Sequence, residues 1–165
     1  MPSDYIVLRG APGTGKTTTA RLLMRLADRG ATVEVDDIRK MINGVVWESH
    51  QQHFDAISAA AAAAKAYRKC GYRPIVFVDT LAFGSLDIAL EALDSSSVSV
   101  YSLVCSRLVL TLRLWRRLGG FRDAAKSVRI DTHVRTDGSH PCEVLDTTST
   151  GARQIARWIM EREGF

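Results

Sequence analysis

The chain has few of the features that mark special classes of protein. Its three cysteines, Cys70, Cys105 and Cys142, lie far apart and form no C-x-x-C pair, so we predict buried free thiols in a reducing compartment. No apolar run approaches the roughly 18 residues that a membrane span needs. The N-terminus carries no signal-peptide pattern. These absences predict a cytoplasmic protein with no membrane association.

A large excess of charge of one sign is also missing. The net charge of +4 comes from 22 basic and 18 acidic residues, and no block of consecutive basic residues occurs. Phosphate-bearing ligands explain such an excess as well as nucleic acid does. The 46% of hydrophobic residues is typical of a globular protein with a core. With no internal repeat or linker in the sequence, we expect residues 1–165 to form a single domain.

One glycine-rich motif organises the rest of the chain. Residues 10–17 read G-A-P-G-T-G-K-T and match the phosphate-binding P-loop, G-x-x-x-x-G-K-[ST]. Backbone N–H groups of such a loop, and the N-terminus of the helix after it, favour phosphate. Lys16 can reach the β- and γ-phosphates, and Thr17 offers a hydroxyl to Mg²⁺. We therefore expect ATP and Mg²⁺ as ligands, with nucleotide contacts from Gly10, Gly13, Thr14, Gly15, Lys16, Thr17 and Thr18.

The apolar pattern predicts an α/β fold. Short apolar runs at residues 5–8, 32–35, 74–79, 98–104 and 143–146 alternate with helical patterns at 18–27, 50–70, 85–93, 106–118 and 152–162. This alternation is typical of a parallel sheet covered on both faces. Ligands of such sheets bind at the carboxyl ends of the strands.

Two carboxylates stand where predicted strands end. Asp79 is expected to serve as a second ligand of Mg²⁺ beside Thr17, although an aspartate at a strand end is also common in turns. Asp36 could accept a proton from a substrate hydroxyl, while its neighbour Asp37 could instead cap the following turn. Arg39, three residues after Asp36, could hold a substrate group or a phosphoryl oxygen, or lie at the surface.

A basic helix follows the fourth strand. Arg113, Arg116 and Arg117 have i, i+3, i+4 spacing and should share one face, where a guanidinium could neutralise a transferring phosphoryl group. The Gly119-Gly120 pair could act as a hinge, so we expect a helical lid over roughly residues 113–140. An exposed basic helix is the alternative.

Two further groups leave alternatives open. His50 and His53, at i, i+3, could bind a metal or a substrate, but no further ligand pattern accompanies them and a zinc site needs three or four ligands. The Asp146-Thr147-Thr148 turn after the last strand could line the adenine ring, through Thr147, or cap the final helix.

These elements, in this order, resemble the small P-loop kinases related to bacteriophage polynucleotide kinase and chloramphenicol phosphotransferase. The resemblance implies a nucleoside-monophosphate-kinase-like fold, with a five-stranded parallel sheet of order 2-3-1-4-5 and a helical lid, and ATP-dependent phosphorylation of a hydroxyl. By the same resemblance Asp36 is the general base and Arg39 contacts the reacting phosphate. The family's lid arginine falls among Arg113, Arg116 and Arg117, without a unique match.

The sequence thus predicts a Mg²⁺- and ATP-dependent phosphotransferase. We expect the acceptor to be a hydroxyl of a small molecule, followed by a 5′-hydroxyl of nucleic acid, and then by a nucleoside or nucleotide. A nucleotide-dependent switch or binding module is the alternative from another class, although the switch elements that it would need are not evident.

Overall fold

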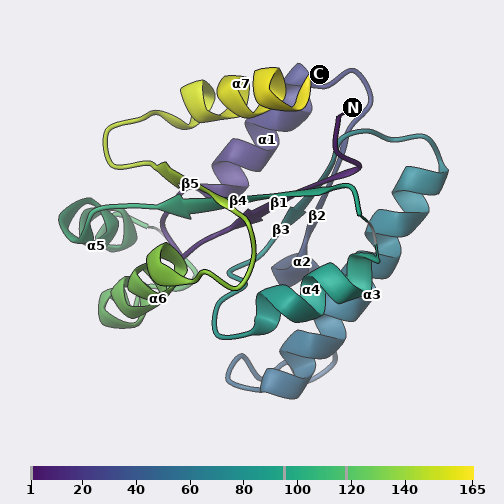
Figure 1. Cartoon of the computed structure of the whole chain (residues 1–165). Helices are drawn as coiled ribbons and strands as arrows, with labels where there is room; N and C mark the ends of the chain where they lie inside the picture. The colour runs from purple at the N-terminus through teal and green to yellow at the C-terminus, as the bar shows by residue number, and fades with distance from the viewer. Residues whose placement is uncertain (1, 95, 118) are drawn as a thin grey trace.

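The computed structural model describes residues 2–94, 96–117 and 119–165, and Figure 1 shows their course. The strands are β1 (Tyr5–Arg9), β2 (Ala31–Glu34), β3 (Ile75–Val78), β4 (Val98–Val104) and β5 (Glu143–Asp146). The helices are α1 (Lys16–Leu26), α2 (Val35–Arg39), α3 (His50–Lys69), α4 (Ser85–Leu93), α5 (Arg107–Trp115), α6 (Ala124–Thr136) and α7 (Ala152–Glu163).

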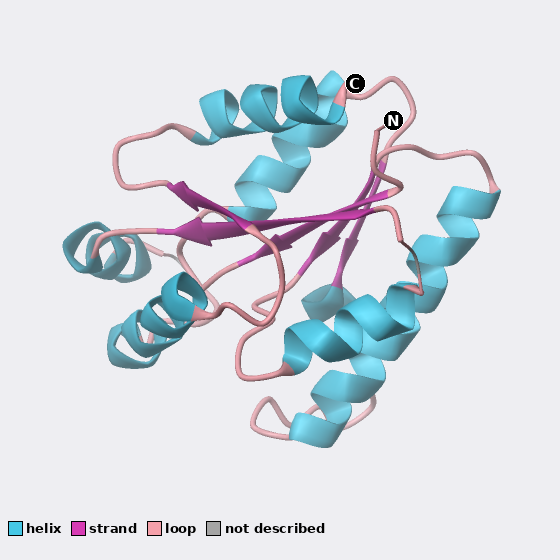
Figure 2. Cartoon of the chain, viewed as in Figure 1, coloured by secondary structure: helices cyan, strands magenta, loops and turns pink. Residues whose placement is uncertain are grey.

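The strands form one parallel sheet with the order β2-β3-β1-β4-β5. This confirms the predicted fold class and strand order. Helices α1 and α7 cover one face of the sheet, and α3 and α4 cover the other (Figure 2). Helices α5 and α6 lie beyond the carboxyl ends of the strands (Figure 1). The P-loop and the segments after β2 and β3 therefore open onto the same edge of the sheet.

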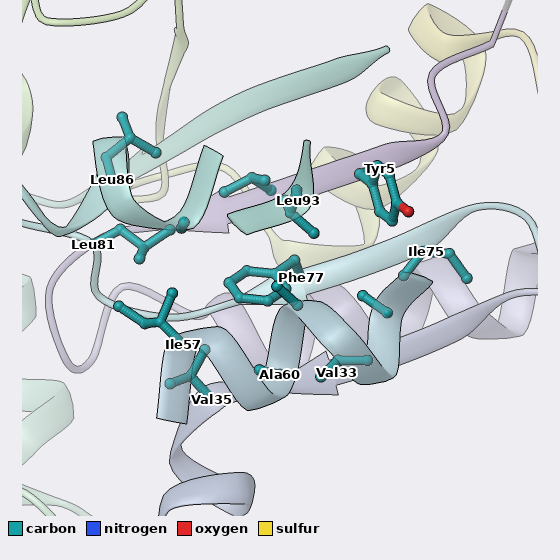
Figure 3. Packing of buried hydrophobic residues seen from close by; sticks show 14 of the residues in the cluster. Tyr5, Val33, Val35, Ile57, Ala60, Ile75, Phe77, Leu81, Leu86 and Leu93 are labelled. Carbon is teal, nitrogen blue, oxygen red and sulfur yellow. The ribbon is translucent and has the colours of Figure 1, made fainter. Parts of the chain in front are cut away.

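Both faces of the central strands are buried, which explains why these strands read as continuous apolar runs. In β1, Tyr5 and Val7 belong to the cluster under α3 and α4, whereas Ile6 and Leu8 pack with α1 and α7. Phe77 of β3 lies in the middle of the first cluster (Figure 3). Burial of such side chains supplies the main driving force for folding.

Helix α3 uses its alanines for close packing. Ala56, Ala60 and Ala64 are buried in the first cluster, and Ala60 faces the sheet in Figure 3. The small side chains bring this helix near the strands and suit its interior, because alanine is the strongest helix former. Ser49 caps the helix by accepting a hydrogen bond from the backbone N–H of Gln52.

Several local expectations need correction. Helix α5 ends at Trp115 rather than near residue 118, which itself lies outside the described residues. The second strand ends at Glu34, so Asp36 stands in the first turn of α2 rather than at a strand end. The three thiols are free, as expected, but Cys70 is exposed and only Cys105 is fully buried. None of the described helices is long and apolar enough to cross a membrane.

Candidate active site

The P-loop joins β1 to α1 through a backbone that only glycine adopts easily. Gly10, Gly13 and Gly15 have φ angles of 147°, 92° and 98°, in a region that L side chains rarely occupy. A Cβ on Gly10 would also lie 2.3 Å from the carbonyl oxygen of Leu103. By contrast, a Cβ on Gly15 would meet no described atom within 4 Å, which shows that this side of the loop is open.

The first turn of α1 presents free backbone donors at this opening. The N-cap residue is Gly15, and within the described chain no side chain caps this end and no acidic residue lies in its first turn. The N–H groups of Lys16, Thr17 and Thr18 thus have no partner in the helix, and the helix dipole favours an anion there. This arrangement fits a phosphate group.

Lys16 lies at the centre of a charged cluster. Its Nζ donates to the carbonyl oxygens of Gly10 (2.7 Å) and Ala11 (3.0 Å). Removal from water lowers the pKa of Lys16 to about 8, against the opposing effect of the negative charges of Asp79 and Asp36. The positive charge of Arg117 also lowers this pKa. Residues expected from the sequence to act together are therefore electrostatically coupled around one ammonium group.

The two neighbouring aspartates of α2 have different surroundings. Asp37 pairs with Lys40 at the exposed surface, at 2.7 Å. The pKa of Asp36 is raised, first by partial removal from water and then by the negative charge of Asp79. A raised pKa makes a carboxylate a better proton acceptor. Of the two candidates, Asp36 is the one whose pKa responds to the charges of Asp79 and Lys16.

Glu34, the last residue of β2, is a site residue that the sequence reasoning missed. Its Oε2 accepts a hydrogen bond from the Thr17 hydroxyl at 2.9 Å. The prediction counted the strand one residue too far, and so read Glu34 as an interior position. The available signal was a carboxylate near the end of the second strand, which lies beside β3 in the sheet.

Asp79 follows β3, next to the P-loop strand, as expected from its position. Its Oδ2 lies 2.6 Å from Nε2 of His53, in the first turn of α3, and its side chain is almost completely buried. Both histidine rings lie near the ring of Phe54, but of the two it is His53 that contacts Asp79.

The oxygen groups near Lys16 fit a magnesium ion better than a softer metal. Thr17, Asp79 and Glu34 are hard oxygen ligands, and Mg²⁺ usually takes one or two protein ligands together with substrate phosphates and water. In the described part of the chain, no three His, Cys, Asp or Glu side chains gather closely enough to hold a metal by themselves. The donor set thus fits an ion that arrives with nucleotide.

Arg39 is buried, contrary to the surface alternative. Its Nη2 donates to the backbone oxygens of Val46, Trp47 and Ser49 at 2.8–3.0 Å, so it holds the segment between α2 and α3. Its Nε is buried without a partner, and no ion pair joins Arg39 to a carboxylate among residues 2–94, 96–117 and 119–165. A buried guanidinium without a counter-ion is able to bind an anion.

The three candidate lid arginines have separate positions. Arg113, near the end of α5, donates to Oγ1 of Thr147 (2.9 Å) and to the Thr147 backbone oxygen (2.6 Å). Arg116 is the exposed C-cap residue of α5, and Arg117 follows the helix. Thus Arg117 is the residue whose charge reaches Lys16. The three arginines therefore divide into Arg113, which binds the β5–α7 turn, and two exposed residues, Arg116 and Arg117.

The turn after β5 does not cap the final helix. The N-cap of α7 is Gly151, so the capping alternative for residues 146–148 is wrong. Thr147 is buried and its Oγ1 also donates to the backbone oxygen of Val104. Through Arg113, this turn is connected to the P-loop, because Nη1 of Arg113 also reaches the carbonyl oxygen of Gly13 at 3.5 Å.

Helix α6 is packed against the P-loop rather than free. Ser127 donates to the carbonyl oxygen of Pro12 at 2.6 Å, and Ile130 and Val134 are buried with Leu110 of α5. Much of the segment predicted as a lid thus belongs to a packed helix pair. Within the described residues, 116–117 and 119–123 between α5 and α6, and 137–140 after α6, are the parts of this segment outside both helices.

Arg9 is the second residue that sequence reasoning missed. It is fully buried at the end of β1. From sequence alone, an arginine at the edge of an apolar run is expected to be exposed. Its Nε donates to Ser102 (2.9 Å) and its Nη1 to Oδ2 of Asp137, just after α6 (2.7 Å). Arg9 thus joins the P-loop strand to α6.

Comparison with solved structures gives the same architecture. The APS kinase of Mycobacterium tuberculosis, solved with AMPPNP and APS, superposes with a TM-score of 0.73 over 97% of this chain and 96% of that chain, at 15% sequence identity. The chain has the fold of the small P-loop kinases. No family model and no curated protein matches it by sequence.

Two further structures with this kinase fold are similar over nearly the whole chain. The tunicamycin resistance protein of Deinococcus radiodurans has a TM-score of 0.71 and 20% identity, covering 99% of this chain and 96% of that one. A sugar kinase from a Janibacter species has a TM-score of 0.67 and 22% identity, covering 98% and 92%. At these identities the likeness establishes the fold alone.

Proposed function

We propose that this protein is an ATP-dependent phosphotransferase that moves the γ-phosphate of ATP to a hydroxyl of a small molecule. The observation that carries the proposal is the coupling of Lys16 to Asp36 and Asp79 beside the uncapped N-terminus of α1. A phosphate site alone would serve a switch or a binding module equally well. A carboxylate with a raised pKa beside that phosphate site is what a transfer to a hydroxyl needs.

The proposed reaction assigns one role to each group. Asp36 takes the proton of the acceptor hydroxyl as its oxygen bonds to the γ-phosphorus. The bond from the γ-phosphorus to the β–γ bridging oxygen breaks, and ADP leaves with that electron pair. The N–H groups of the P-loop, Lys16 and Arg117 stabilise the negative charge on the phosphoryl oxygens.

Two more ligand contacts complete the proposal. Thr17 and Asp79 would hold Mg²⁺, which when bound neutralises phosphate charge and orients the phosphates for in-line transfer. Arg39, buried and without a carboxylate partner in the described chain, would bind the reacting phosphate or an anionic group of the acceptor. Thr147 and Arg113 would lie beside the base of the nucleotide.

The similar kinases support a small-molecule acceptor. The solved structures include a sugar kinase and an APS kinase with its small substrate. A 5′-hydroxyl of nucleic acid is the second candidate acceptor, suggested by the Asp36-Asp37-x-Arg39 motif. We place the protein in the cytoplasm, because ATP is available there and cysteine thiols remain reduced.

The test is an ATP-consumption screen over hydroxyl metabolites and 5′-hydroxyl oligonucleotides, with Lys16→Met as the inactive control. We expect ADP release that depends on one class of acceptor and disappears in the variant. ATP hydrolysis that is slow and indifferent to every acceptor would support the switch alternative. Absence of ATP binding would overturn the assignment of the site.

A further inference from the structure

The loop after β3 holds an exposed aromatic ring in a strained backbone. Leu81 and Phe83 have φ angles of 46° and 55°, in the left-handed region that residues other than glycine avoid. Leu81 is fully buried, so packing compensates for its conformation, but the Phe83 side chain is among the exposed large hydrophobic ones, with 65% of the residue accessible. Stability of the fold therefore explains Leu81 and leaves Phe83 without an explanation.

Phe83 is nevertheless held in one place. Its backbone N–H donates to Nε2 of His133 on α6 at 3.0 Å. The two rings stack with centroids 4.3 Å apart and an interplanar angle of 24°. The loop itself is tied to the P-loop strand, because Nη1 of Arg9 donates to the carbonyl oxygen of Leu81 at 3.4 Å. The ring is thus preorganised, with one face on the imidazole and much of its remaining surface accessible.

The position of this ring relates it to the proposed site. Phe83 lies four residues after Asp79, at the carboxyl end of β3, and β3 lies between β1, which carries the P-loop, and β2, which leads to Asp36. The segment after β3 and the segment after β2 thus emerge on neighbouring strands at the same edge of the sheet (Figure 1). This edge, on the side of Asp36, is where an acceptor would meet the γ-phosphate.

The segment after β2 carries a second accessible ring. Trp47 is 47% exposed, and the guanidinium of Arg39 lies over its ring, 5.1 Å from the centroid. Arg39 also binds the backbone on both sides of this residue, so Trp47 is fixed as Phe83 is. The same segment exposes Met41 and Val46. Both segments that begin at the proposed catalytic carboxylates thus offer apolar surface to solvent.

We propose that the acceptor of this phosphotransferase carries an aromatic ring beside its reacting hydroxyl, and that Phe83 and Trp47 bind that ring. The inference rests on the proposed function, because the location of the rings has meaning only if Asp36 activates a hydroxyl. Aromatic rings bind other rings by stacking and by excluding water from both. A site for a bare polyol would instead present convergent polar side chains around the reacting hydroxyl.

The test uses two probes that differ only in the aromatic group, phenyl β-D-glucopyranoside and methyl β-D-glucopyranoside. Their dissociation constants are measured by calorimetric titration on the full chain loaded with ADP. We expect the phenyl compound to bind at least about 10-fold more tightly, as burial and stacking of one ring imply. Phe83→Ala and Trp47→Ala should each remove most of this difference. Phe165→Ala, which truncates an exposed phenylalanine at the far end of the chain, should leave it unchanged.

Other outcomes overturn the inference. Equal binding of the two probes, no binding of the phenyl compound, or a preference that survives both Phe83→Ala and Trp47→Ala would each exclude an aromatic subsite here. Phe83→Gly supplies a further readout, because glycine relieves the backbone strain. Its melting temperature should be no lower than that of the wild type while the phenyl preference is lost, whereas a structural role for Phe83 would lower it. ADP affinity, titrated separately, tests the proposed function on its own.

Discussion

Single residues of the site combine function with a cost in stability, and Lys16 shows this most clearly. Its pKa in the folded protein is about 8, below the ordinary value of lysine, so the unfolded chain holds the extra proton between pH 8 and about 10.5. Removal of the charged lysine from water therefore lowers the free energy of unfolding in full below pH 8. This loss of stability disappears as the pH rises from 8 to about 10.5. This ammonium, partly removed from water, is kept for the phosphates that it would bind.

We expect Lys16→Met to raise the free energy of unfolding by about 1–3 kcal/mol at pH 7, with a smaller gain at pH 9.5. The same variant should lose about 10²–10³ in phosphotransfer rate, since a preorganised charge is removed. Chemical denaturation and ADP release measure the two effects. Lys69→Met, at the exposed end of α3, should not stabilise the protein. A destabilised Lys16→Met would mean that the hydrogen bonds of this lysine outweigh its burial.

Asp36 and Asp37 can be distinguished by pH as well as by rate. Since partial removal from water and the charge of Asp79 raise the pKa of Asp36, kcat/KM should rise with pH as the base loses its proton, with a midpoint above the ordinary aspartate value. Asp36→Asn should lower kcat by roughly 10²–10⁴ and abolish that rise. Asp37→Asn should leave both unchanged, because its partner is the exposed Lys40. The opposite pattern would transfer the role of base to Asp37.

At the level of whole elements, we predict different roles for the three arginines of α5 and the segment after it. Arg117→Ala should lower kcat more than it raises KM, because its charge lies near Lys16 and acts on the transition state. Arg113→Ala should chiefly raise KM for ATP, since Arg113 holds Thr147. Arg116→Ala is the matched surface control. Steady-state kinetics measure these effects. If all three variants were near normal, residues other than these arginines would compensate the negative charge of the phosphoryl group.

Helix α3 reaches the sheet edge through His53, which we predict positions Asp79. With nucleotide bound, His53→Ala should weaken Mn²⁺ binding by about 10-fold, because groups that orient a metal ligand typically contribute this much. His53→Gln, which can still donate to Asp79, should be affected less, and His50→Ala should match the wild type. Electron paramagnetic resonance of free Mn²⁺ gives the affinities without relying on turnover. Equal affinity in all variants would make the His53–Asp79 contact purely structural.

Elements with strong local signals were predictable from sequence, while contacts between distant segments were not. The bounds of α4, β4 and β5 agree with those expected, because their apolar patterns are short and sharply ended. Helix α5 stops earlier than the Gly119-Gly120 pair suggested, and its last turns pack against α6. The pairing of His53 with Asp79 spans 26 residues, and no local pattern specifies it.

For the molecule as a whole, the ion pair of Arg9 and Asp137 joins the P-loop strand to α6 across 128 residues. Burial alone would raise the pKa of Asp137, but hydrogen bonds from Arg9 and Ser139 outweigh it and lower this pKa to about 2. A carboxyl pKa lowered on folding stabilises the protein above the unfolded value near 3.8, and this contribution disappears as the pH falls toward 2.

Asp137→Asn should therefore lower the free energy of unfolding by about 2–4 kcal/mol at pH 7, because it also leaves the buried Arg9 charge unpaired. The difference from the wild type should shrink between pH 4 and pH 2. Asp87→Asn, which removes an exposed partner of His140, is the control and should change little. Denaturant unfolding across this pH range measures both. A constant difference at every pH would mean that the carboxylate charge is not what Arg9 requires.

The burial of Arg9 also affects the order in which the chain can fold during its synthesis on the ribosome. Synthesis delivers residues from the N-terminus, so the first strand emerges long before Asp137 is made. Until then the guanidinium has no carboxylate to receive it, and sealing it inside the sheet would leave a lone charge in the interior. A nascent chain therefore gains from keeping its phosphate-binding end open to water until nearly the whole of it has been translated.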